Sequence, residues 1–398
     1  MTYLNRRRFL QLTGFTALPL FSGIAAAGKC PGVAIEPGPQ FNKSDVWFIN
    51  DGPIYKPTEY IRKLNEIDST QPIMRDFYGE GGAINDLQKK FIDVTGKQAA
   101  IYMPSGTLAN QLAISELSGR NTKVFVQETS HVYRDEADAA QKIFNKRLIP
   151  LAKGEAYFTK DDLQKSVQYH EEGEVFKSGK GGVVSIENPV RRNNGAFVPF
   201  DELKKISDYC RANDLKLHLD GARIYMASAA TGKSIAEYAS LFDTVYISLY
   251  KYLGAGGGAI LCGPVEVIEK MSHLIKIHGG SAFSSWANGA MALHHLDGLD
   301  ERLRKSALKS AELFKLLNAT GKMNIIPLEK NNTNGYSLKF APGINAKKVV
   351  GELREKHSLI FQSPDPAGII TVRINDSILL QENATIVEKL MNTIKIAV

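Results

Sequence analysis

The chain has 398 residues, of which 43% are hydrophobic and 23% are charged, and this is the composition of a globular protein long enough to form two domains. The formal net charge of +7 is modest, and no basic run is interleaved with aromatic residues, so nucleic acid is not predicted as a partner. The three cysteines, Cys30, Cys210 and Cys262, are odd in number and widely spaced, which argues against a disulfide framework and against a metal site.

The first 27 residues have the pattern of a targeting signal. The pair Arg6 and Arg7 precedes Phe9 and Leu10, and an apolar stretch then ends in three alanines. This pattern resembles a twin-arginine signal peptide, with an ordinary secretory signal or an uncleaved anchor as alternatives. We therefore expect a periplasmic or otherwise exported protein that uses the twin-arginine export machinery, with a cytoplasmic location as the alternative. That route carries folded proteins, which is an indirect indication of a bound cofactor.

The segment after the signal, residues 28–45, is rich in proline, glycine and lysine and is predicted to be a linker. Residues 53–70 carry a helical pattern of apolar residues. A polar glycine turn follows, and then a helix with Leu87 and Phe91 on its apolar face, for which Gly96 is the stop signal. The folded body is therefore expected to begin where the linker ends.

A strand–turn–helix unit comes next, in the sequence AAIYMPSGTLANQL, with the turn at PSGT and the helix from about residue 107. Such a unit directs backbone N–H groups and the positive end of the helix dipole at the turn, which suits a phosphate group. Ser105, Gly106 and Thr107 are therefore the candidate phosphate-binding residues. The alternative is that Ser105 serves only as the N-cap of the helix.

Two further strands place polar residues at one edge of the predicted sheet. The strand KVFVQE is followed by a loop with His131, at the edge where ligands bind in open α/β folds. An imidazole there can stack on an aromatic cofactor, although a satisfied surface histidine would show the same pattern. The strand LKLHL ends at Asp220, with Arg223 shortly after it. A buried aspartate in this position can hold a protonated pyridine nitrogen, and a helix N-cap is the alternative.

Lys251 follows the β-branched strand TVYIS and precedes the glycine-rich segment GAGGG. Partial burial in such a place lowers the pKa of a lysine towards the neutral, nucleophilic form of its amine. A lysine is placed in this way to form a Schiff base with pyridoxal phosphate. The alternative is a solvated residue at a strand end.

The rest of the chain is mostly helical over residues 263–296, and a long helix beginning near residue 300 leads to alternating strands and helices. This alternation predicts a small C-terminal domain. We therefore expect a cofactor-binding large domain with its N-terminal segment over residues 46–298, and a smaller domain over residues 299–398.

Four motifs, YGE, PSGTLAN, HLDGAR and SLYKYLGA, occur in an order and at spacings that resemble the threonine aldolase and β-eliminating lyase family of fold-type I pyridoxal-phosphate enzymes. The most specific part is HLDGAR with the lysine that follows it. The resemblance implies an α/β fold of the fold-type I PLP-dependent transferase-like class, in which a large domain with a mainly parallel central sheet is joined by a smaller C-terminal α/β domain. It also implies pyridoxal 5'-phosphate (PLP) as cofactor, an amino acid as substrate, and a homodimer or homotetramer.

The resemblance also implies a role for each candidate residue. Lys251 would carry the cofactor, Asp220 would hold its ring nitrogen and His131 would stack on its ring, and these three are the predicted catalytic residues. The other predicted cofactor-binding residues are Ser105, Gly106, Thr107 and Arg223. The predicted substrate-binding residues are Arg223, Arg373 and Asn50, the last of which stands where the family has a serine that touches the substrate carboxylate.

The chain departs from the family pattern on the loop after its middle strand. The family has a threonine–histidine pair there, whereas here Glu187 and Asn188 are followed by the segment PVRR, so that histidine is missing. We hypothesise that Arg191 or Arg192 faces the substrate and selects a second carboxylate or a phosphate through bidentate contacts. The alternative is that both arginines are surface residues.

The predicted reaction is aldol cleavage of a β-hydroxy-α-amino acid to glycine and an aldehyde, with His131 or a water that it orients taking the proton of the β-hydroxyl. In the alternative reactions, β-elimination or transamination, Lys251 would instead remove the Cα proton. A non-catalytic binding protein that has kept the fold is a second alternative, and the presence of both Asp220 and Lys251 argues against it.

Overall fold

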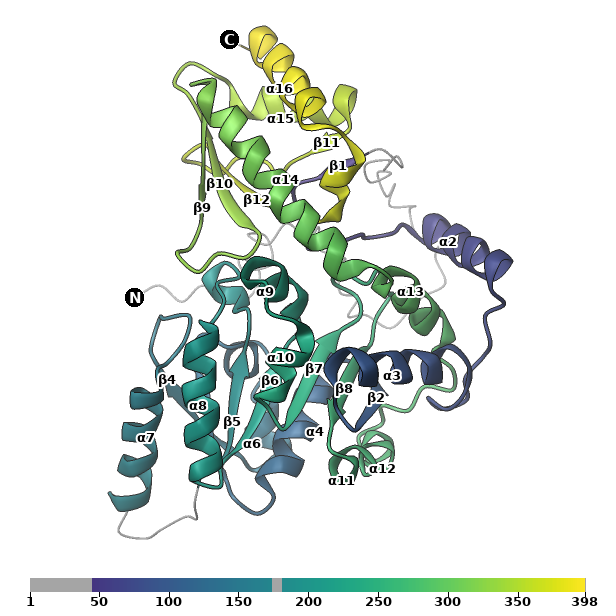
Figure 1. The fold of residues 1–398 in the computed structure, drawn as a ribbon, viewed down its shortest axis with the longest axis vertical. Coiled ribbons are helices and arrows are strands. Elements are labelled where there is room, and N and C mark those ends of the chain that lie inside the picture. Colours follow the sequence, from purple (N-terminus) through teal and green to yellow (C-terminus); the bar gives the residue numbers. More distant parts are fainter. Residues whose placement is uncertain (1–44, 174–180, 398) are drawn as a thin grey trace, which may run out of the picture. The chain divides into compact units, whose positions relative to one another are not determined.

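The structure, a computed structural model, describes residues 45–173 and 181–397, and it is built around a seven-stranded β-sheet (Figure 1). The strands lie in the order β2-β8-β7-β6-β5-β3-β4, and neighbouring strands are parallel except where β8 pairs with β2 and β7. Their bounds are β2 (Ala99–Met103), β3 (Lys123–Gln127), β4 (Arg147–Leu151), β5 (Gly181–Glu187), β6 (Lys216–Asp220), β7 (Thr244–Ser248) and β8 (Ala259–Gly263). The predicted signal peptide and residues 28–44 of the predicted linker lie outside the described residues.

The central strands are buried on both faces of this sheet. Every residue of β3, β5, β7 and β8 is buried. Successive side chains of a strand point to opposite faces, and in β7 Val245 and Ile247 pack in one apolar cluster while Tyr246 packs in another. Such near-continuous burial is typical of a parallel sheet with helices on both sides.

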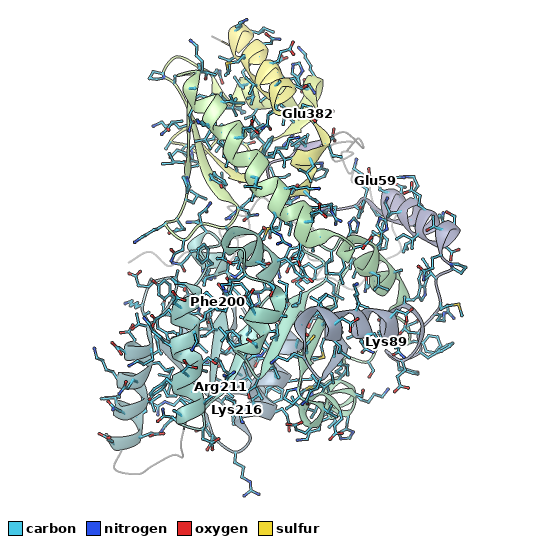
Figure 2. The ribbon with its side chains drawn as sticks, viewed as in Figure 1. Glu59, Lys89, Phe200, Arg211, Lys216 and Glu382 are labelled. Carbon is cyan, nitrogen blue, oxygen red and sulfur yellow. The ribbon has the colours of Figure 1, made fainter. Side chains whose placement is uncertain are left out.

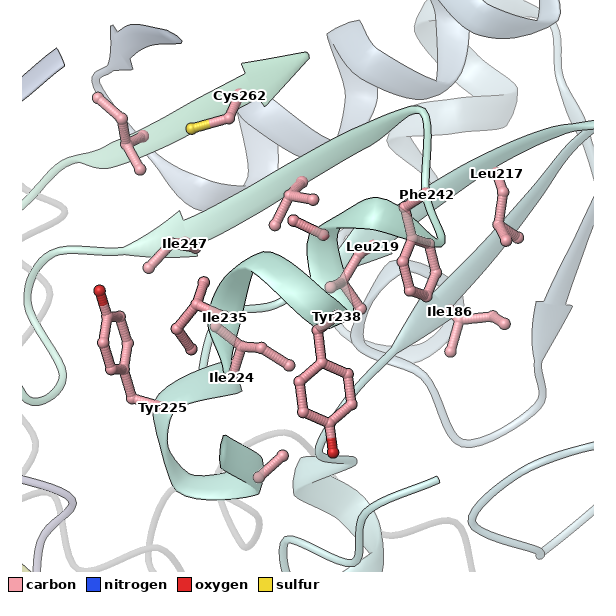
Figure 3. Packing of buried hydrophobic residues seen from close by; sticks show 14 of the residues in the cluster. Ile186, Leu217, Leu219, Ile224, Tyr225, Ile235, Tyr238, Phe242, Ile247 and Cys262 are labelled. Carbon is pink, nitrogen blue, oxygen red and sulfur yellow. The ribbon is translucent and has the colours of Figure 1, made fainter. Parts of the chain in front are cut away.

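Helices cover the two faces of the sheet. The helices whose side chains share an apolar cluster with Tyr246, or pack beside it, are α4 (Gly106–Ser118), α6 (Ala139–Phe144), α11 (Val265–Ile268) and α12 (Met271–Ile277). The helices of the opposite cluster are α3 (Gly82–Thr95), α7 (Lys160–Glu172), α8 (Phe200–Ala212), α9 (Ile224–Thr231), α10 (Ile235–Ser240) and α13 (Trp286–Leu296). Figure 3 shows Tyr225 of α9 and Tyr238 of α10 packed in that cluster with Leu219 and Ile247 of the sheet.

The helix predicted after the glycine turn is confirmed as α3. Its buried residues include Leu87 and Phe91, which lie on one face because they are four residues apart. It ends at Gly96, whose φ of 65° lies in the left-handed region that favours glycine. The preceding helix, α2 (Pro57–Thr70), begins with a proline in its first turn and has no buried residue.

A second apolar core is formed by the C-terminal elements. The antiparallel strands β9 (Met323–Pro327), β10 (Gly335–Phe340) and β12 (Ile369–Arg373) pack with the helices α14 (Leu299–Ala319), α15 (Ala346–His357) and α16 (Asn383–Ala397). The short strand β1 (Val46–Trp47) pairs in parallel with β11 (Leu359–Ile360), and Val46 and Phe48 pack in the same core. The first described residues therefore pack with elements more than 300 residues away in the chain.

Helix α14 links the two apolar cores. Leu299 and Leu303 in its first turns belong to the core of the large sheet, whereas Leu313 and Leu317 belong to the C-terminal core. The predicted domain boundary at residue 298 lies just before this helix, and the division into two domains stays a prediction. The remaining short elements are α5 (His131–Arg134), η1 (Arg191–Asn193) and η2 (Asp376–Leu380).

Many charged side chains lie on the surface. Lys89, Arg211 and Lys216, labelled in Figure 2, are exposed. Across residues 45–173 and 181–397, no helix combines the length and the apolar character needed to cross a membrane.

Candidate active site

A cavity of about 340 Å³ lies at the carboxyl ends of the parallel strands. It is lined by Pro104, Ser105, Gly106, Thr107, His131, Asp135, Glu187, Asp220, Ala222, Arg223, Tyr246, Tyr250, Lys251, Gly256, Gly257 and Gly258. All seven residues predicted to bind the cofactor or to act in catalysis are among them. The carboxyl ends of parallel strands meet at one edge of a sheet, which is why residues so far apart in the chain share one cavity.

The N-terminus of α4 forms one end of this cavity. The Ser105 hydroxyl accepts a hydrogen bond from the N–H of Leu108 at 3.2 Å, so Ser105 is an N-cap, as the alternative interpretation predicted. The other N–H groups in the first turn of α4 remain available to an anion, because the first N–H groups of a helix have no partner within the helix. Gly106 is required here, since a Cβ atom would lie 2.0 Å from the Tyr246 hydroxyl oxygen.

Asp220 is buried at the end of β6, with 2% of its surface exposed. Its Oδ1 accepts a hydrogen bond from the N–H of Ala222 at 3.2 Å, and its Oδ2 accepts one from the Asn110 side chain at 2.9 Å. The N-cap of helix α9 is Arg223, so Asp220 is not a helix cap. A carboxylate buried at a cavity wall is suited to holding a cationic group of a ligand.

His131 is a partly buried residue of the cavity wall. Its Nδ1 lies 3.0 Å from Glu136 Oε1, and its backbone N–H donates to Glu187 Oε2 at 2.7 Å. Burial opposes the charging of the ring, but the hydrogen bond to Glu136 and the charge of Asp220 outweigh it and raise the pKa of His131 above its ordinary value. The structure therefore anchors this histidine inside the site.

Lys251 lies three residues beyond the end of β7, with its Nζ 4.8 Å from the centre of the Tyr250 ring. Burial, together with the charge of the nearby Arg223 guanidinium, lowers the pKa of Lys251 from 10.5 to about 8. With a pKa of about 8, about a tenth of this amine is neutral, and nucleophilic, at pH 7.

We expect the acylation rate of Lys251 to rise with pH up to about 8 and then to level off, because only the neutral amine reacts and its pKa is about 8. The exposed Lys270 is the control, because its hydrogen bond to Glu116 raises the pKa of this lysine. The acylation rate of Lys270 should therefore still rise at about pH 10. The measurement is acylation of the protein between about pH 6 and about pH 10, read residue by residue by mass spectrometry. A Lys251 rate that parallels that of Lys270 would contradict the lowered pKa.

The predicted substrate-binding residues are only partly brought together. Arg223 lines the cavity, and its Nε lies 2.6 Å from Asp51 Oδ2, so a resident carboxylate already pairs with it. Arg373 donates to the carbonyl oxygen of Asn194 at 2.6 Å and also influences Asp51 electrostatically, but it is not on the cavity wall. Asn50 is not on the wall either, and its carbonyl oxygen accepts from Asn375 at 2.7 Å.

Arg191 and Arg192 lie on η1, beside the cavity. Arg192 makes a bidentate contact with Asp135, with its Nε 3.0 Å from Asp135 Oδ2, and Arg191 Nη1 lies 3.5 Å from the same oxygen. Asp135 lines the cavity, whereas neither arginine does. The two arginines therefore neighbour the site through a shared carboxylate, and the structure does not place them against a substrate.

Sequence reasoning missed three buried polar residues that shape the site: Glu187, Glu136 and Asn110. Glu187 lines the cavity, and burial, with the charge of Asp220, raises the pKa of Glu187 to about 7. Its place at the end of β5, in register with Asp220 at the end of β6, was a usable signal. Asn110 ends the motif PSGTLAN, but its place inside a helix did not indicate a role in the site. Glu136 follows a short helix and carried no comparable signal.

The fold and the lysine-bearing cavity define a class of protein, the fold-type I α/β enzymes. The β-eliminating lyase family matches residues 63–339, which is well over half of the chain. This protein therefore belongs to the β-eliminating lyase family.

Two curated relatives and one solved structure illustrate the similarity. The low-specificity L-threonine aldolase of Candida albicans is 36% identical over 222 residues, covering 55% of this chain and 58% of that protein, which is less than two thirds of its length. The low-specificity L-threonine aldolase of Eremothecium gossypii is 31% identical over 296 residues, covering 72% and 75%. A candidate aromatic amino acid β-eliminating lyase/threonine aldolase of Exiguobacterium sp. 255-15 shares the fold, with a TM-score of 0.71 and 24% identity over 87% of this chain and 96% of that one.

Proposed function

We propose that this protein is a PLP-dependent lyase that cleaves a β-hydroxy-α-amino acid to glycine and an aldehyde. The observation that carries the proposal is that all seven predicted cofactor-binding and catalytic residues line one cavity. Membership of the β-eliminating lyase family, and similarity to proteins named low-specificity L-threonine aldolases, support the same reaction.

The residues present fit PLP. The aldehyde, the ring nitrogen and the phosphate of PLP require three groups. These are an amine with a lowered pKa at Lys251, a buried carboxylate at Asp220 and a helix N-terminus at Gly106. A cavity of about 340 Å³ is in the range that holds small ligands. Lys251 would hold the cofactor covalently. When bound, PLP supplies a protonated, electron-withdrawing ring that stabilises negative charge at the substrate Cα.

The protein's own residues then orient the substrate and move its protons. Asp220 would hold the ring nitrogen of PLP protonated, and His131, whose Nδ1 lies 3.0 Å from Glu136 Oε1, would stack on the ring. The Nε2 of His131 is the nitrogen left to accept the β-hydroxyl proton, directly or through a water. Arg223 orients the substrate carboxylate, although it must then share its guanidinium with Asp51.

β-Elimination or transamination is the second candidate. The observation that favours it is the replacement of the family's histidine-bearing loop by the segment that contains Arg191 and Arg192. In these reactions Lys251 removes the Cα proton, and its pKa of about 8 suits a general base near neutral pH.

The test of the proposed function is spectroscopic and chemical. Purified protein should bind PLP with an absorbance band near ~420 nm, as expected of PLP attached to a lysine. It should then release glycine and an aldehyde from β-hydroxy-α-amino acids. Release of ammonia and a keto acid in place of glycine would favour the second candidate, and a protein that stays colourless with added PLP would favour a non-catalytic binding protein.

We also predict that the Arg191 and Arg192 pair selects an acidic substrate. Arg192 is committed to Asp135 by two nitrogens and Arg191 only by one longer contact, so Arg191 is the better candidate for reaching a second carboxylate. Arg191→Ala should lower kcat/KM for an acidic β-hydroxy amino acid by about ten- to a hundred-fold, which corresponds to one charged contact. Threonine should be a poor substrate of the wild type. The prediction fails if the wild type cleaves threonine efficiently and the ratio of kcat/KM for the two substrates is unchanged in Arg191→Ala and Arg192→Ala. Both arginines would then be surface residues without a role in substrate selection.

Export by the twin-arginine route is proposed from the sequence of residues 1–27 alone. A precursor with Arg6→Lys and Arg7→Lys together should accumulate in the cytoplasm with its cofactor bound, because lysine does not replace the arginine pair that the route recognises. Fractionation of cells that express each precursor measures this. Unchanged export of the double variant would point to the general secretory route.

A homodimer or homotetramer is proposed from the family resemblance. An exposed aromatic cluster supports it: Phe77, Tyr78 and Phe283 are each more than half exposed, and Phe283 lies 5.5 Å from each of the other two rings. Exposed apolar groups of this kind mark contact surfaces. Light scattering on purified protein would give the oligomeric state.

A further inference from the structure

A chain of buried polar side chains connects helix α4 with strands β6 and β7. Asn110 lies in the second turn of α4, and His218 and Asp220 lie two residues apart on β6, so both of their side chains point to the face that α4 covers. Thr244 on β7 is in register with His218. None of these four residues is more than 2% exposed, so each polar atom depends on its neighbours in the protein for a partner.

The side-chain amide of Asn110 bridges two carboxylates. Its Nδ2 lies 2.9 Å from Asp220 Oδ2 and 2.9 Å from Glu136 Oε1, so its two N–H bonds serve two different acids. Its Oδ1 lies 3.0 Å from His218 Nε2. An amide oxygen can only accept, so His218 Nε2 is the donor in this contact.

The other ring nitrogen of His218 completes the chain. His218 Nδ1 lies 2.8 Å from the Thr244 hydroxyl oxygen, and as Nε2 carries the proton of the neutral ring, Nδ1 accepts from that hydroxyl. Burial lowers the pKa of His218 to about 4, so the ring is neutral at pH 7. The contacts therefore run in one direction, from Thr244 through His218 and Asn110 to the two carboxylates.

Glu136 extends this series of hydrogen bonds to His131. The same oxygen that accepts from Asn110, Oε1, lies 3.0 Å from His131 Nδ1, and Gln111 donates to the other oxygen. One asparagine thus connects the carboxylate at the end of β6 with the histidine that follows β3.

We propose that Asn110 is a positioning residue that holds Asp220 and, through Glu136, His131 in place together, and that His218 and Thr244 set the orientation of its amide. This inference rests on the proposed function, in which Asp220 and His131 both face PLP.

The physical reason lies in the two buried acids. Asp220 and Glu136 are 2% and 3% exposed and reach the same amide nitrogen, so they would repel each other without a shared donor. A reversed amide would direct its oxygen at both carboxylates, and Asp220 Oδ2 would lose the hydrogen bond that Asn110 donates to it. In the observed orientation the amide oxygen accepts from His218 Nε2, and this contact reinforces the orientation in which both N–H bonds face the carboxylates.

The first experiment replaces the amide by an apolar side chain of similar size. Asn110→Leu should bind PLP with a dissociation constant about 10- to 150-fold higher than that of the wild type, the change expected from the loss of hydrogen bonds to charged groups. PLP is titrated into each apoprotein and followed at ~420 nm. Circular dichroism and the apoprotein melting temperature report separately on the fold.

A matched pair of variants at His218 keeps the test decisive even where Asn110→Leu does not fold. The amide nitrogen of a glutamine reaches about as far as Nε2 of a histidine, and that of an asparagine about as far as Nδ1. His218→Gln therefore keeps a donor for Asn110, whereas His218→Asn keeps only the contact with Thr244. PLP should bind to His218→Gln nearly as it does to the wild type, and about 2- to 10-fold more weakly to His218→Asn.

Each outcome decides the proposal. PLP binding close to that of the wild type in His218→Gln, and weaker binding in His218→Asn, supports the proposal. Each variant removes one contact of the same ring, so a merely structural role of His218 would not distinguish the two variants. Equal PLP dissociation constants for the two variants, or wild-type binding by a folded Asn110→Leu, would overturn the inference and leave the proposed function standing. A wild-type protein that binds no PLP would overturn the proposed function and this inference with it.

Discussion

Replacing Lys251 by alanine is expected to abolish the covalent attachment of PLP and to reduce turnover by about 10³-fold or more. The amine is the group that would hold the cofactor and, in the β-elimination and transamination alternatives, the base that removes the Cα proton. The fold should survive, because Lys251 lies on a loop beyond β7 and its side chain belongs to no apolar core. Borohydride reduction followed by mass spectrometry would find a pyridoxyl group on Lys251 of the wild type and none on the variant.

The exposed Lys270 provides a matched control. Lys270→Ala removes the same side chain from a surface position that pairs with Glu116, and its PLP content and turnover should equal those of the wild type. A Lys251→Ala protein that still carries covalent PLP, at any other lysine, would show that another amine holds the cofactor.

The second large effect is expected from Asp220→Asn, which keeps the shape of the side chain and removes its charge. A protonated ring nitrogen would then face a neutral amide in a buried site, and the loss of one partner of a buried ion pair costs about 3–5 kcal/mol. We expect kcat/KM to fall by about 10²- to 10⁴-fold, with PLP still attached to Lys251. Steady-state kinetics and the absorbance near ~420 nm measure the two quantities separately.

Asp135→Asn is the control for Asp220→Asn. Asp135 lines the same cavity, but the guanidinium of Arg192 pairs with it, and burial is outweighed by that arginine, which lowers the pKa of Asp135. Its replacement should change kcat/KM by about ten-fold at most, the range of a partly exposed ion pair. Similar losses of kcat/KM in the two variants would mean that any negative charge in the cavity has this effect, and that Asp220 has no specific role.

The family and the fold class could be predicted from the sequence, and both are confirmed by the β-eliminating lyase match and by the similarity to solved structures. The information was local: each motif combines a strand end with a polar residue, and a parallel sheet brings such ends to one edge. The helix ending at Gly96 was predictable for the same reason, since its apolar period and its stop signal lie within a few residues.

Elements that depend on distant partners were missed. The two-residue strand β1 has no period of its own, and it exists because Val46 and Trp47 pair with β11 at the other end of the chain. Strand β9 carries little signal of its own either, because only one of its faces is buried and its apolar run is short. Arg373 was expected at the substrate, but its guanidinium donates to Asn194, on a loop whose path no local pattern specifies.

The sequence by itself determined which groups are available for chemistry: Lys251 beside flexible glycines, Asp220 at a strand end, and Ser105 and Gly106 at the start of a helix. Only the tertiary structure decided their state and orientation, because pKa values and hydrogen bonds depend on burial and on neighbours that are distant in the chain. Burial lowers the pKa of Lys251 to about 8. Asn110 closes the motif PSGTLAN, but only the structure shows that it joins Asp220 to Glu136, because α4 packs against β6.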